Sequence, residues 1–201
     1  MKFSADKIKK AVESKGYKWF EGGDYNLNIV GVRNSDTKGV VTNKFDDTLT
    51  LTYEVGGELK YHEFTATTDP GSHWEKNLLN KDGVAILCPG QYRGSHTIGL
   101  HQGKYEALKQ QKPVKVYRDN NMDGKYDMIE ENIQEGIFGI NIHKAGSRAE
   151  GSTQIDKWSA GCQVISKESD FNQLMELAHK AAALYGKSFT YTLIESKDIV
   201  G

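Results

Sequence analysis

The sequence predicts a strand-dominated α+β protein with one main domain and a short helix near its N-terminus. Most of the chain consists of short segments in which apolar and polar residues alternate, the pattern of strands with one buried face. Only two stretches, one near each end, repeat their apolar residues at the spacing of an amphipathic helix. The chain has 201 residues, of which 37% are hydrophobic and 26% charged, which suits a folded domain with a core of its own.

The first expected element is a short helix. Ser4 suits its N-cap and Gly16 suits its C-terminal end. Its buried face would consist of Ile8, Ala11 and Val12. We therefore expect residues 1–25 to form a helical appendage and residues 26–201 to form the main domain.

Strands follow this helix for most of the chain. The segments with strand patterns are residues 27–34, 47–55, 58–68, 84–88, 113–118 and 136–143. Gly56 and Gly57 are a hairpin signal between the second and third segments, and residues 69–83 are expected to form a loop. The segment 136–143, GIFGINIH, is expected to be buried on both faces.

The C-terminal part changes its period. An amphipathic helix is expected up to Gly186, which suits the C-cap, and a final strand over residues 188–195. The buried face of the helix would consist of Phe171, Leu174, Ala178, Ala181 and Tyr185.

Charge and hydropathy exclude several classes of function. The net charge is −1, and Lys and Arg are spread along the chain, so we expect no nucleic-acid partner. No apolar run reaches the roughly 18 residues of a membrane span, so no membrane insertion is expected. The opening MKFSADKIKK lacks the apolar region of a secretory signal. Three explanations stay open: synthesis in a cytoplasm with another route of export, release from a phage-infected cell, or a signal that is absent from this chain. We expect the protein to be a monomer.

One histidine and one cysteine form a candidate catalytic pair. His143 ends an alternating apolar run, and Cys162 lies 19 positions later in a Ser-Ala-Gly-Cys turn. A thiol attacks a carbonyl as thiolate, and we expect the imidazole to accept its proton and stabilise that thiolate. The N–H groups of Gly161 and Cys162 could hold the developing oxyanion. The alternative is a buried, inert cysteine beside an unrelated histidine.

This segment resembles the catalytic stretch of the L,D-transpeptidase (YkuD-type) family. That family has a His, a loop, and Ser or Thr followed by His-Gly-Cys; His143, Ser159, Gly161 and Cys162 match these positions. The order of elements is similar over residues 45–194, including the helix and last strand after the cysteine. The resemblance implies that the main domain is an L,D-transpeptidase-like catalytic domain, a mixed β-sheet or β-sandwich.

Two positions depart from the family pattern. Ala160 stands where the family usually has a His before Gly-Cys, and Val164 stands where it usually has an Arg or Asn two places after the Cys. Those positions help to hold the substrate in the family, so binding mode and acceptor preference stay open. The candidate substrate contacts in this chain are Trp158, Tyr92, His96 and Gln163.

The resemblance also implies a reaction. It starts at the amide between an L-centred residue of a peptidoglycan stem peptide and a D-amino acid. Cys162 forms a thioester and D-alanine leaves; an amine acceptor then completes transpeptidation, or water completes hydrolysis. Both outcomes share the acyl-enzyme, so both stay open. The expected partners are peptidoglycan stem peptides, the place of action is the cell wall, and no organic cofactor is expected.

Residues 119–130, DNNMDGKYDMIE, match a twelve-residue calcium-binding loop. The loop has Gly124 at the turn position and oxygen donors at the ligand positions. The expected ligands are Asp119, Asn121, Asp123, Lys125 through its carbonyl, Asp127 and Glu130. The segment before it reads as a strand rather than an EF-hand helix, and an ordinary polar turn is the alternative. We expect a structural Ca²⁺ that stiffens the segment leading to His143.

Two other functions remain as alternatives. Residues 94–101, GSHTIGLH, contain a His-x-x-Gly pattern like that of zinc D,D-peptidases, with His96 and His101 as candidate ligands and no evident third ligand. A phage or secreted cell-wall hydrolase using zinc is therefore one alternative. The other is a non-catalytic wall-binding module of the same fold, which the departures at Ala160 and Val164 would fit.

Overall fold

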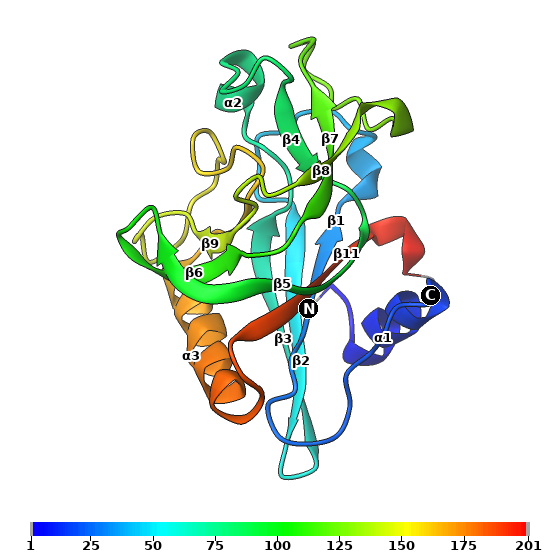
Figure 1. Cartoon of the computed structure of the whole chain (residues 1–201), viewed down its shortest axis with the longest axis vertical. Coiled ribbons are helices and arrows are strands. Elements are labelled where there is room, and N and C mark those ends of the chain that lie inside the picture. Colours follow the sequence, from blue (N-terminus) through cyan, green and yellow to red (C-terminus); the bar gives the residue numbers. More distant parts are fainter. Residues whose placement is uncertain (1, 200–201) are drawn as a thin grey trace.

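The computed structural model describes residues 2–199, which form eleven β-strands, three α-helices and three short 3-10 helices (Figure 1). Strands dominate and helices are few, so the predicted strand-dominated α+β class is confirmed. The strands divide into a closed barrel and a small separate sheet.

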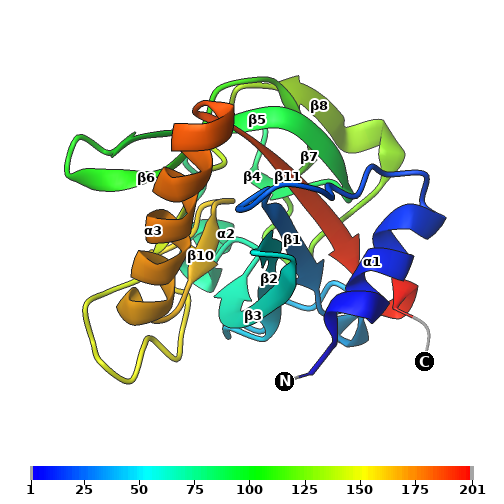
Figure 2. The same ribbon diagram turned by 90° about the horizontal axis from the view of Figure 1, so that it is seen from below.

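Eight strands close into the barrel in the order β1-β11-β5-β6-β9-β10-β3-β2 (Figures 1 and 2). They are β1 (Asn28–Arg33), β2 (Asp47–Val55), β3 (Glu58–Thr67), β5 (Gly90–His101), β6 (Tyr105–Gln110), β9 (Ile142–Lys144), β10 (Gln163–Ile165) and β11 (Ser188–Glu195). β1 pairs with β11, and β9 with β10, in parallel; the other neighbours in the barrel are antiparallel. The sequence predicted a mixed sheet or a sandwich. The strand directions are mixed, but the sheet closes on itself, which leaves no free edge on the barrel.

A three-stranded antiparallel sheet lies at one end of the barrel, in the order β4-β7-β8 (Figure 1). Its strands are β4 (Val84–Leu87), β7 (Val114–Asp119) and β8 (Ile133–Gly136). The short helix α2 (Ser72–Lys76) lies in the segment 69–83 that the sequence predicted as loop. Side chains of β4 and β7 extend the barrel core, so the two sheets share apolar packing.

Helix α3 (Glu168–Tyr185) packs along β6, β9 and β10 on one side of the barrel (Figure 2). Of its predicted buried face, Phe171, Leu174, Ala178 and Ala181 are buried in the core. Tyr185 is the exception: it is 51% exposed, and its hydroxyl donates to the carbonyl of Asp24. Within residues 2–199, no helix has the length and apolar character needed to span a membrane.

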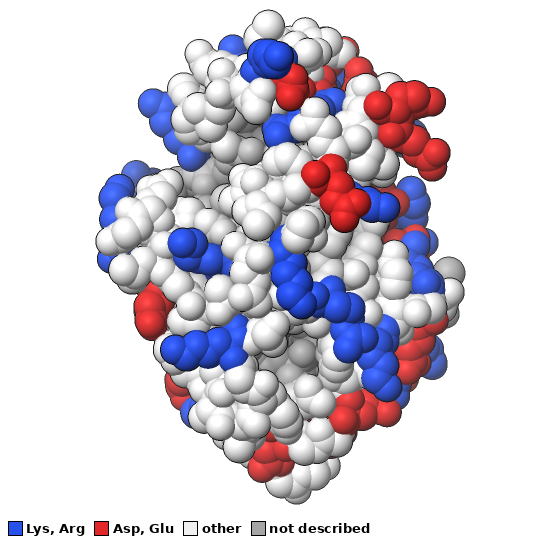
Figure 3. Space-filling model, viewed as in Figure 1, with Lys and Arg blue, Asp and Glu red and all other residues white. Residues whose placement is uncertain are grey.

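Helix α1 (Ala5–Ser14) covers the opposite side of the barrel (Figure 2). Its predicted N-cap is confirmed, because the Ser4 side chain accepts from the Lys7 N–H. The expected face is also buried, in a cluster formed by Ile8, Ala11, Val12, Trp19, Val30, Val32 and Ile194. The N-terminal segment therefore packs on the outer faces of β1 and β11. On the face of the molecule seen in Figure 1, basic and acidic side chains are distributed over many elements, and neither sign covers the face (Figure 3).

Two features of the barrel differ from the sequence prediction. Strands β5 and β6 were not predicted, because half-exposed polar residues and glycines interrupt their apolar alternation. The expected strand 136–143 is broken between β8 and β9. There the N–H groups of Phe138 and Ile140 donate to the Gln110 side chain at 3.1 and 2.9 Å rather than to a neighbouring strand. Gly139, at φ +74°, makes the bend between them.

Gly31 gives a direct test of the packing inside the barrel. A Cβ at this position would lie 1.9 Å from the Tyr191 hydroxyl, which donates to Gln163 Oε1 at 2.8 Å. We expect Gly31→Ala to lower the free energy of unfolding by about 1–3 kcal/mol, the usual cost of overpacking, measured by urea denaturation. Gly99→Ala is the matched control in β5, because its Cβ would meet only the flexible Lys109 side chain. Equal losses in the two variants would contradict this account.

Candidate active site

The pairing of β9 with β10 brings the predicted catalytic residues to one face of the sheet. In this parallel pair, Val164 lies opposite His143. Side chains alternate along each strand, and Ile142 points into the barrel core, so His143 points outward. Cys162, two residues before Val164, belongs to the same outer face. Cys162 directly precedes β10 and packs against the same cluster as Val164, so the thiol and the imidazole lie on the same side of the sheet.

Tyr105 on β6 joins this pair. Its hydroxyl lies 3.3 Å from His143 Nδ1, and Nδ1 lies 2.8 Å from the carbonyl oxygen of Lys144. A carbonyl can only accept, so we assign the proton to Nδ1, which leaves the lone pair on Nε2. Burial and the nearby Cys162 raise the pKa of Tyr105 to about 12, so the phenol stays protonated. The imidazole is thus held in the tautomer that a general base needs.

A second histidine restrains the first. The rings of His101 and His143 stack with centroids 4.1 Å apart, and His101 Nδ1 lies 3.1 Å from the Asn141 side-chain nitrogen. Burial, with a smaller contribution from His101, lowers the pKa of His143 to about 4. The imidazole is therefore neutral at neutral pH and available to accept a proton.

The thiol is neutral as well. Cys162 is partly buried, and its Sγ–H donates to the carbonyl of Gly139 at 3.2 Å. Burial raises the pKa of Cys162 to about 11, and hydrogen bonding from the Asn141 backbone offsets part of that effect. The sequence argument expected His143 to stabilise a thiolate. The structure instead shows a resting thiol directed at a carbonyl, because burial disfavours charge on both groups.

Ser159 and Gly161 shape the turn before the thiol. The buried Ser159 hydroxyl donates to the Cys162 carbonyl at 2.8 Å and accepts from the Gly161 N–H at 3.1 Å. This N–H is therefore not free to hold an oxyanion, which corrects the prediction for Gly161. The Cys162 N–H has no hydrogen-bond acceptor among residues 2–199, so it remains the candidate donor to an oxyanion. Gly161 has a different requirement: at φ +132°, its Cβ would lie 2.3 Å from the carbonyl oxygen of Ala85.

Three of the four predicted substrate contacts have structural roles. His96 is 1% exposed, and its ring nitrogens lie 2.8 Å from the Ile140 carbonyl and the Ser95 hydroxyl. Gln163 is also buried and accepts from the Tyr191 hydroxyl inside the barrel. Their prediction as substrate contacts was wrong, because side-chain direction depends on a strand register that the sequence did not reveal.

Of the other two predicted substrate contacts, Tyr92 has a structural role and Trp158 is exposed. The half-buried Tyr92 donates its hydroxyl to the Cys88 carbonyl at 2.6 Å, with the Lys115 carbonyl 3.3 Å away, and so joins β5 to the small sheet. It was predicted as a cleft residue and is a structural one. Trp158 is 45% exposed and lies over Gly146, near the start of the loop that follows β9. It remains a candidate wall of the substrate cleft.

The sequence did not predict the pocket beside the turn. This pocket has a volume of about 260 Å³, and its walls include Trp74, Leu79, Val84, Phe138, Ala160 and Arg118. Figure 3 shows a hollow in this region, between the small sheet with α2 and the β6–β9 side of the barrel. These residues come from separate segments that meet only in the folded chain. Of them, Ala160 stands at a motif position, next to the Gly-Cys pair, and Trp74 was expected from its residue type to be a packing or cleft-wall residue.

The predicted calcium loop follows β7 and folds on itself. Asp119 is 5% exposed, and its carboxylate accepts from the N–H groups of Asn121 and Asp127 at 3.3 and 3.2 Å. The Asn121 side chain donates to Asp127 at 2.9 Å and contacts Asp123 at 3.4 Å. Burial, together with repulsion from Asp127 and Asp123, raises the pKa of Asp119. Carboxylates that repel one another in this way are a setting in which a cation would be stabilising.

The end of the loop does not complete a ligand set in this conformation. Glu130 starts the 3-10 helix η2 (Glu130–Asn132) and is exposed, and the Lys125 N–H donates to Asp123 at 3.0 Å. Within residues 2–199, no three His, Cys, Asp or Glu side chains are grouped so that they could hold a metal ion. Tyr126 anchors the loop, because its N–H donates to the Gly39 carbonyl at 2.8 Å.

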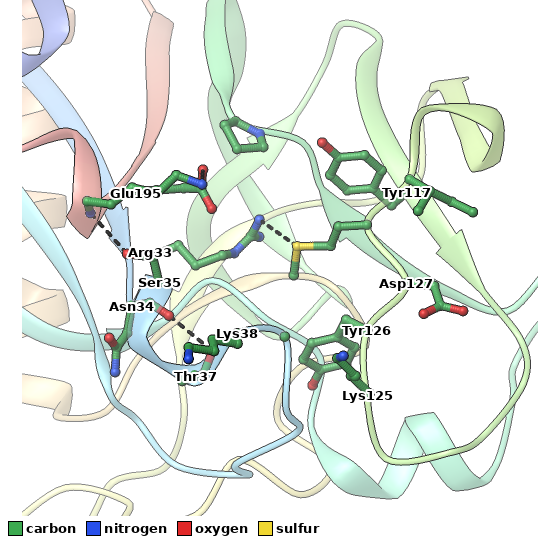
Figure 4. Close-up of a pocket in the computed structure, with 15 residues that line it drawn as sticks. Arg33, Asn34, Ser35, Thr37, Lys38, Tyr117, Lys125, Tyr126, Asp127 and Glu195 are labelled. Atoms are coloured by element: carbon green, nitrogen blue, oxygen red, sulfur yellow. Dashed lines mark hydrogen bonds and ion pairs between the residues drawn. The ribbon is translucent and has the colours of Figure 1, made fainter.

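A larger pocket of about 550 Å³ borders this loop (Figure 4). The buried Arg33 reaches into it toward Met128, while its Nε pairs with Asp69 at 2.8 Å. Tyr117 lines this pocket, whereas its neighbour on β7, Arg118, lines the pocket beside the cysteine. Successive side chains point to opposite faces of a strand. The calcium loop therefore borders a different cavity from the one beside the thiol.

The residues proposed as zinc ligands are engaged elsewhere. Both ring nitrogens of His96 are occupied in the barrel interior, and His101 stacks on His143. Zinc binding by this pair would require His96 to break two buried hydrogen bonds. No family model, curated protein or solved structure matches this chain.

The buried histidines predict a loss of stability in acid. Burial lowers the pKa of both His96 and His143 to about 4 from an ordinary 6.5, so the unfolded chain binds protons at a higher pH than the folded chain. Their contribution is complete above pH 6.5 and is lost as the pH falls from about 6.5 to 4, at up to about 3 kcal/mol per residue. We expect His143→Asn, whose amide can still donate to the Lys144 carbonyl, to flatten this dependence in urea denaturation between pH 7 and 4.5.

His179 is the matched control for that experiment. Its side chain is 52% exposed and pairs with Glu106 at the surface. His179→Asn should leave the acid-induced loss of stability as it is in the wild-type chain. An equal loss in wild type and His143→Asn would contradict the assignment of His143 as a buried neutral residue.

Proposed function

We propose that this chain is a cysteine-dependent enzyme for acyl transfer or hydrolysis at L,D-peptide bonds of peptidoglycan stem peptides. One observation carries the proposal: Cys162, next to β10, and His143, on β9, lie on the same face of the sheet, with the proton of His143 assigned to Nδ1 and no hydrogen-bond partner for its Nε2 among residues 2–199. The resemblance of residues 143–162 to L,D-transpeptidases supports the substrate class. The proposal places the enzyme's work at the cell wall, with stem peptides as its partners.

The first half of the proposed reaction forms a thioester. The thiol turns from the Gly139 carbonyl, its proton passes to His143 Nε2, and Sγ attacks the carbonyl carbon of the L,D-amide. The oxygen gains negative charge, which the Cys162 N–H stabilises. The C–N bond then breaks, and His143 returns the proton to the leaving amine. Since both groups are neutral at rest, proton transfer accompanies the attack.

The second half resolves the thioester. A water or an amine gives a proton to His143 Nε2 and attacks the acyl carbon, and the Cys162 sulfur leaves and regains a proton. Water gives hydrolysis and an amine gives a cross-link, so the two outcomes differ only in the acceptor. Tyr105 and His101 act as positioning residues, because one contacts the proton-bearing nitrogen of His143 and the other stacks on its ring.

We also propose that residues 119–130 bind a structural Ca²⁺. Burial is the main cause that raises the pKa of Asp119, and the repulsion from Asp127 and Asp123 that adds to it would be relieved by a divalent cation. The loop is tied to Gly39 and lies away from the thiol, so the ion would act on stability rather than supply the chemistry.

The proposed nucleophile can be identified by its covalent adduct. We expect incubation with a carbapenem, which acylates the cysteine of L,D-transpeptidases, to add one drug mass to the intact protein. The adduct should be absent in Cys162→Ala and present in Cys88→Ala, because Cys88 is buried and burial raises its pKa to about 11. An adduct on Cys88, or one that survives in Cys162→Ala, would overturn the assignment. Binding to sacculi without release of muropeptides would instead indicate a wall-binding module.

The calcium proposal predicts a shift in melting temperature. Calcium should stabilise the folded chain by RT ln(1 + [L]/Kd), about 2.7 kcal/mol at a hundredfold excess over Kd. Mg²⁺ should do much less, because it requires a smaller octahedral site. Asp119→Ala and Glu130→Ala should abolish the shift, and Asn120→Ala, at a non-ligand position, should retain it. Identical melting curves in calcium and in EGTA would reduce the loop to a polar turn.

A further inference from the structure

Arg118 in the pocket beside the thiol is held in a fixed orientation. Its Nε donates to Gln134 Oε1 at 3.0 Å, and its Nη1 donates to the Gly83 carbonyl at 3.0 Å. The guanidinium carbon lies 4.8 Å from the centre of the Phe138 ring. Two hydrogen bonds and one stacking contact fix the plane of the guanidinium. Little side-chain entropy is therefore left to lose when a ligand binds to it.

This cation lacks an anionic partner in the described chain. Among residues 2–199, no carboxylate lies within 4.0 Å of the Arg118 nitrogens, and Nη2 donates to no protein acceptor. Partial burial lowers the pKa of Arg118, and the nearby Asp82 offsets part of that effect. A half-buried guanidinium with unused donors is a ready partner for a carboxylate, which it can bind through two parallel N–H···O bonds.

The pocket borders the catalytic turn on two sides. Ala160 in its wall stands two residues before Cys162, and Phe138 stands next to Gly139, whose carbonyl accepts from the thiol. Ala85, also in the wall, lies against Gly161. A ligand in the pocket would therefore contact residues next to the turn that carries Cys162. The other walls combine apolar and aromatic side chains, including Trp74, with the uncharged Asn80, so the charge available to a ligand is concentrated at Arg118.

We propose that this pocket is a substrate subsite in which Arg118 binds a free carboxylate of the stem peptide. The inference rests on the proposed function and adds the recognised group. A stem peptide has two carboxylates near the scissile amide: the C-terminal carboxylate of the D-alanine that leaves, and the side-chain carboxylate of a diaminopimelate that supplies the acyl group. The apolar walls would contact the carbon chain on which either carboxylate is carried.

Binding can be measured apart from catalysis with Cys162→Ala protein. The probes are tetrapeptides L-Ala-γ-D-Glu-X-D-Ala in which X is L-lysine or meso-diaminopimelate. The first is made with a free or an amidated C-terminus, and the second with a free or an amidated side-chain carboxylate. We expect one of the two amidations to weaken binding about tenfold or more, since charge-assisted hydrogen bonds are lost. The sensitive peptide identifies which carboxylate Arg118 holds.

Variants then locate that preference. In the Cys162→Ala background, Arg118→Gln should bind the free and amidated forms of the sensitive peptide equally weakly, and Arg118→Lys should restore part of the difference. Ala160→Leu, which fills the pocket without changing its charge, should weaken both forms. Arg93→Gln is the matched control, because Arg93 also stacks on an aromatic ring, Phe20, but lies on the exposed side of β5. Arg93→Gln should keep the wild-type preference.

The subsite and the proposed function fail in different ways. A protein that forms the Cys162 adduct and cleaves free and amidated peptides alike, with Arg118→Gln matching wild type, would overturn the subsite and leave the enzyme proposal standing. Absence of any adduct or cleavage, with carboxylate-dependent binding retained, would overturn the enzyme proposal alone. Melting curves of each variant identify loss of folding, and in that case Ala160→Leu and Arg118→Lys decide the subsite. If folded Cys162→Ala protein with an otherwise unchanged pocket binds the free and amidated forms of both peptides equally, the subsite proposal is refuted.

Discussion

The parallel pairing of β9 with β10 is the constraint on which the proposed site depends. Each strand has three residues, too few to hold a register alone, so their neighbours must fix it. β10 also pairs with β3, and β9 with β6. The Gln110 side chain accepts hydrogen bonds from two backbone N–H groups of the bend before β9, and the Gln163 side chain accepts one from the Tyr191 hydroxyl inside the barrel. A one-residue slip of β9 against β10 would turn the His143 side chain into the barrel core and away from the thiol.

Burial then determines the charge state of the two groups. The same low-polarity surroundings raise the pKa of Cys162 to about 11 and lower that of His143 to about 4. A resting thiolate–imidazolium pair would place two charges where solvation is poor, so the neutral pair dominates at neutral pH. In the proposed reaction, charge appears on the sulfur only as it passes to the substrate oxygen. In that reaction the Cys162 N–H would stabilise the oxygen, and the fixed His143 tautomer would accept the thiol proton. A preformed thiolate would then be unnecessary.

Local patterns allowed much of the fold to be predicted from sequence. The α1 cap, the β2–β3 hairpin at Gly56-Gly57, β4, α3 and β11 all follow from periodicity and turn residues within a few positions. β5 and β6 did not, because their hydrogen-bonding partners rather than their composition make them strands. Closure of the barrel depends on pairings between distant segments, such as β1 with β11, for which one sequence carries no signal.

The same division holds within the site. A motif singled out Cys162 and His143 as the candidate pair, because they stand at recognisable positions. Tyr105, Gly139 and Arg118 contribute through tertiary contacts from three other elements, so spacing could not reveal them. The error at Gly161 has the same origin: its N–H is taken by Ser159 Oγ, a contact visible only once the turn is folded. His96 and Gln163 were attractive as polar residues near the motif, but the strand register turns them inward.

The two departures from the L,D-transpeptidase pattern have packing explanations in this chain. Val164 is fully buried in a cluster with Phe45, Ala145 and Ile155, so an arginine at 164 would have to carry its charge through that cluster. Ala160 lines the pocket beside the thiol, where a histidine would occupy part of its volume. Small apolar residues at both positions remove polar groups from the turn and leave space next to it. The cation that remains in that space is Arg118, supplied by β7 across the pocket. In the proposed subsite, substrate charge is recognised from the small sheet, which contacts the turn where Ala85 meets Gly161, rather than from the strand that follows Cys162. The absence of the polar residues that L,D-transpeptidases have at these two positions is therefore compatible with the proposed enzyme.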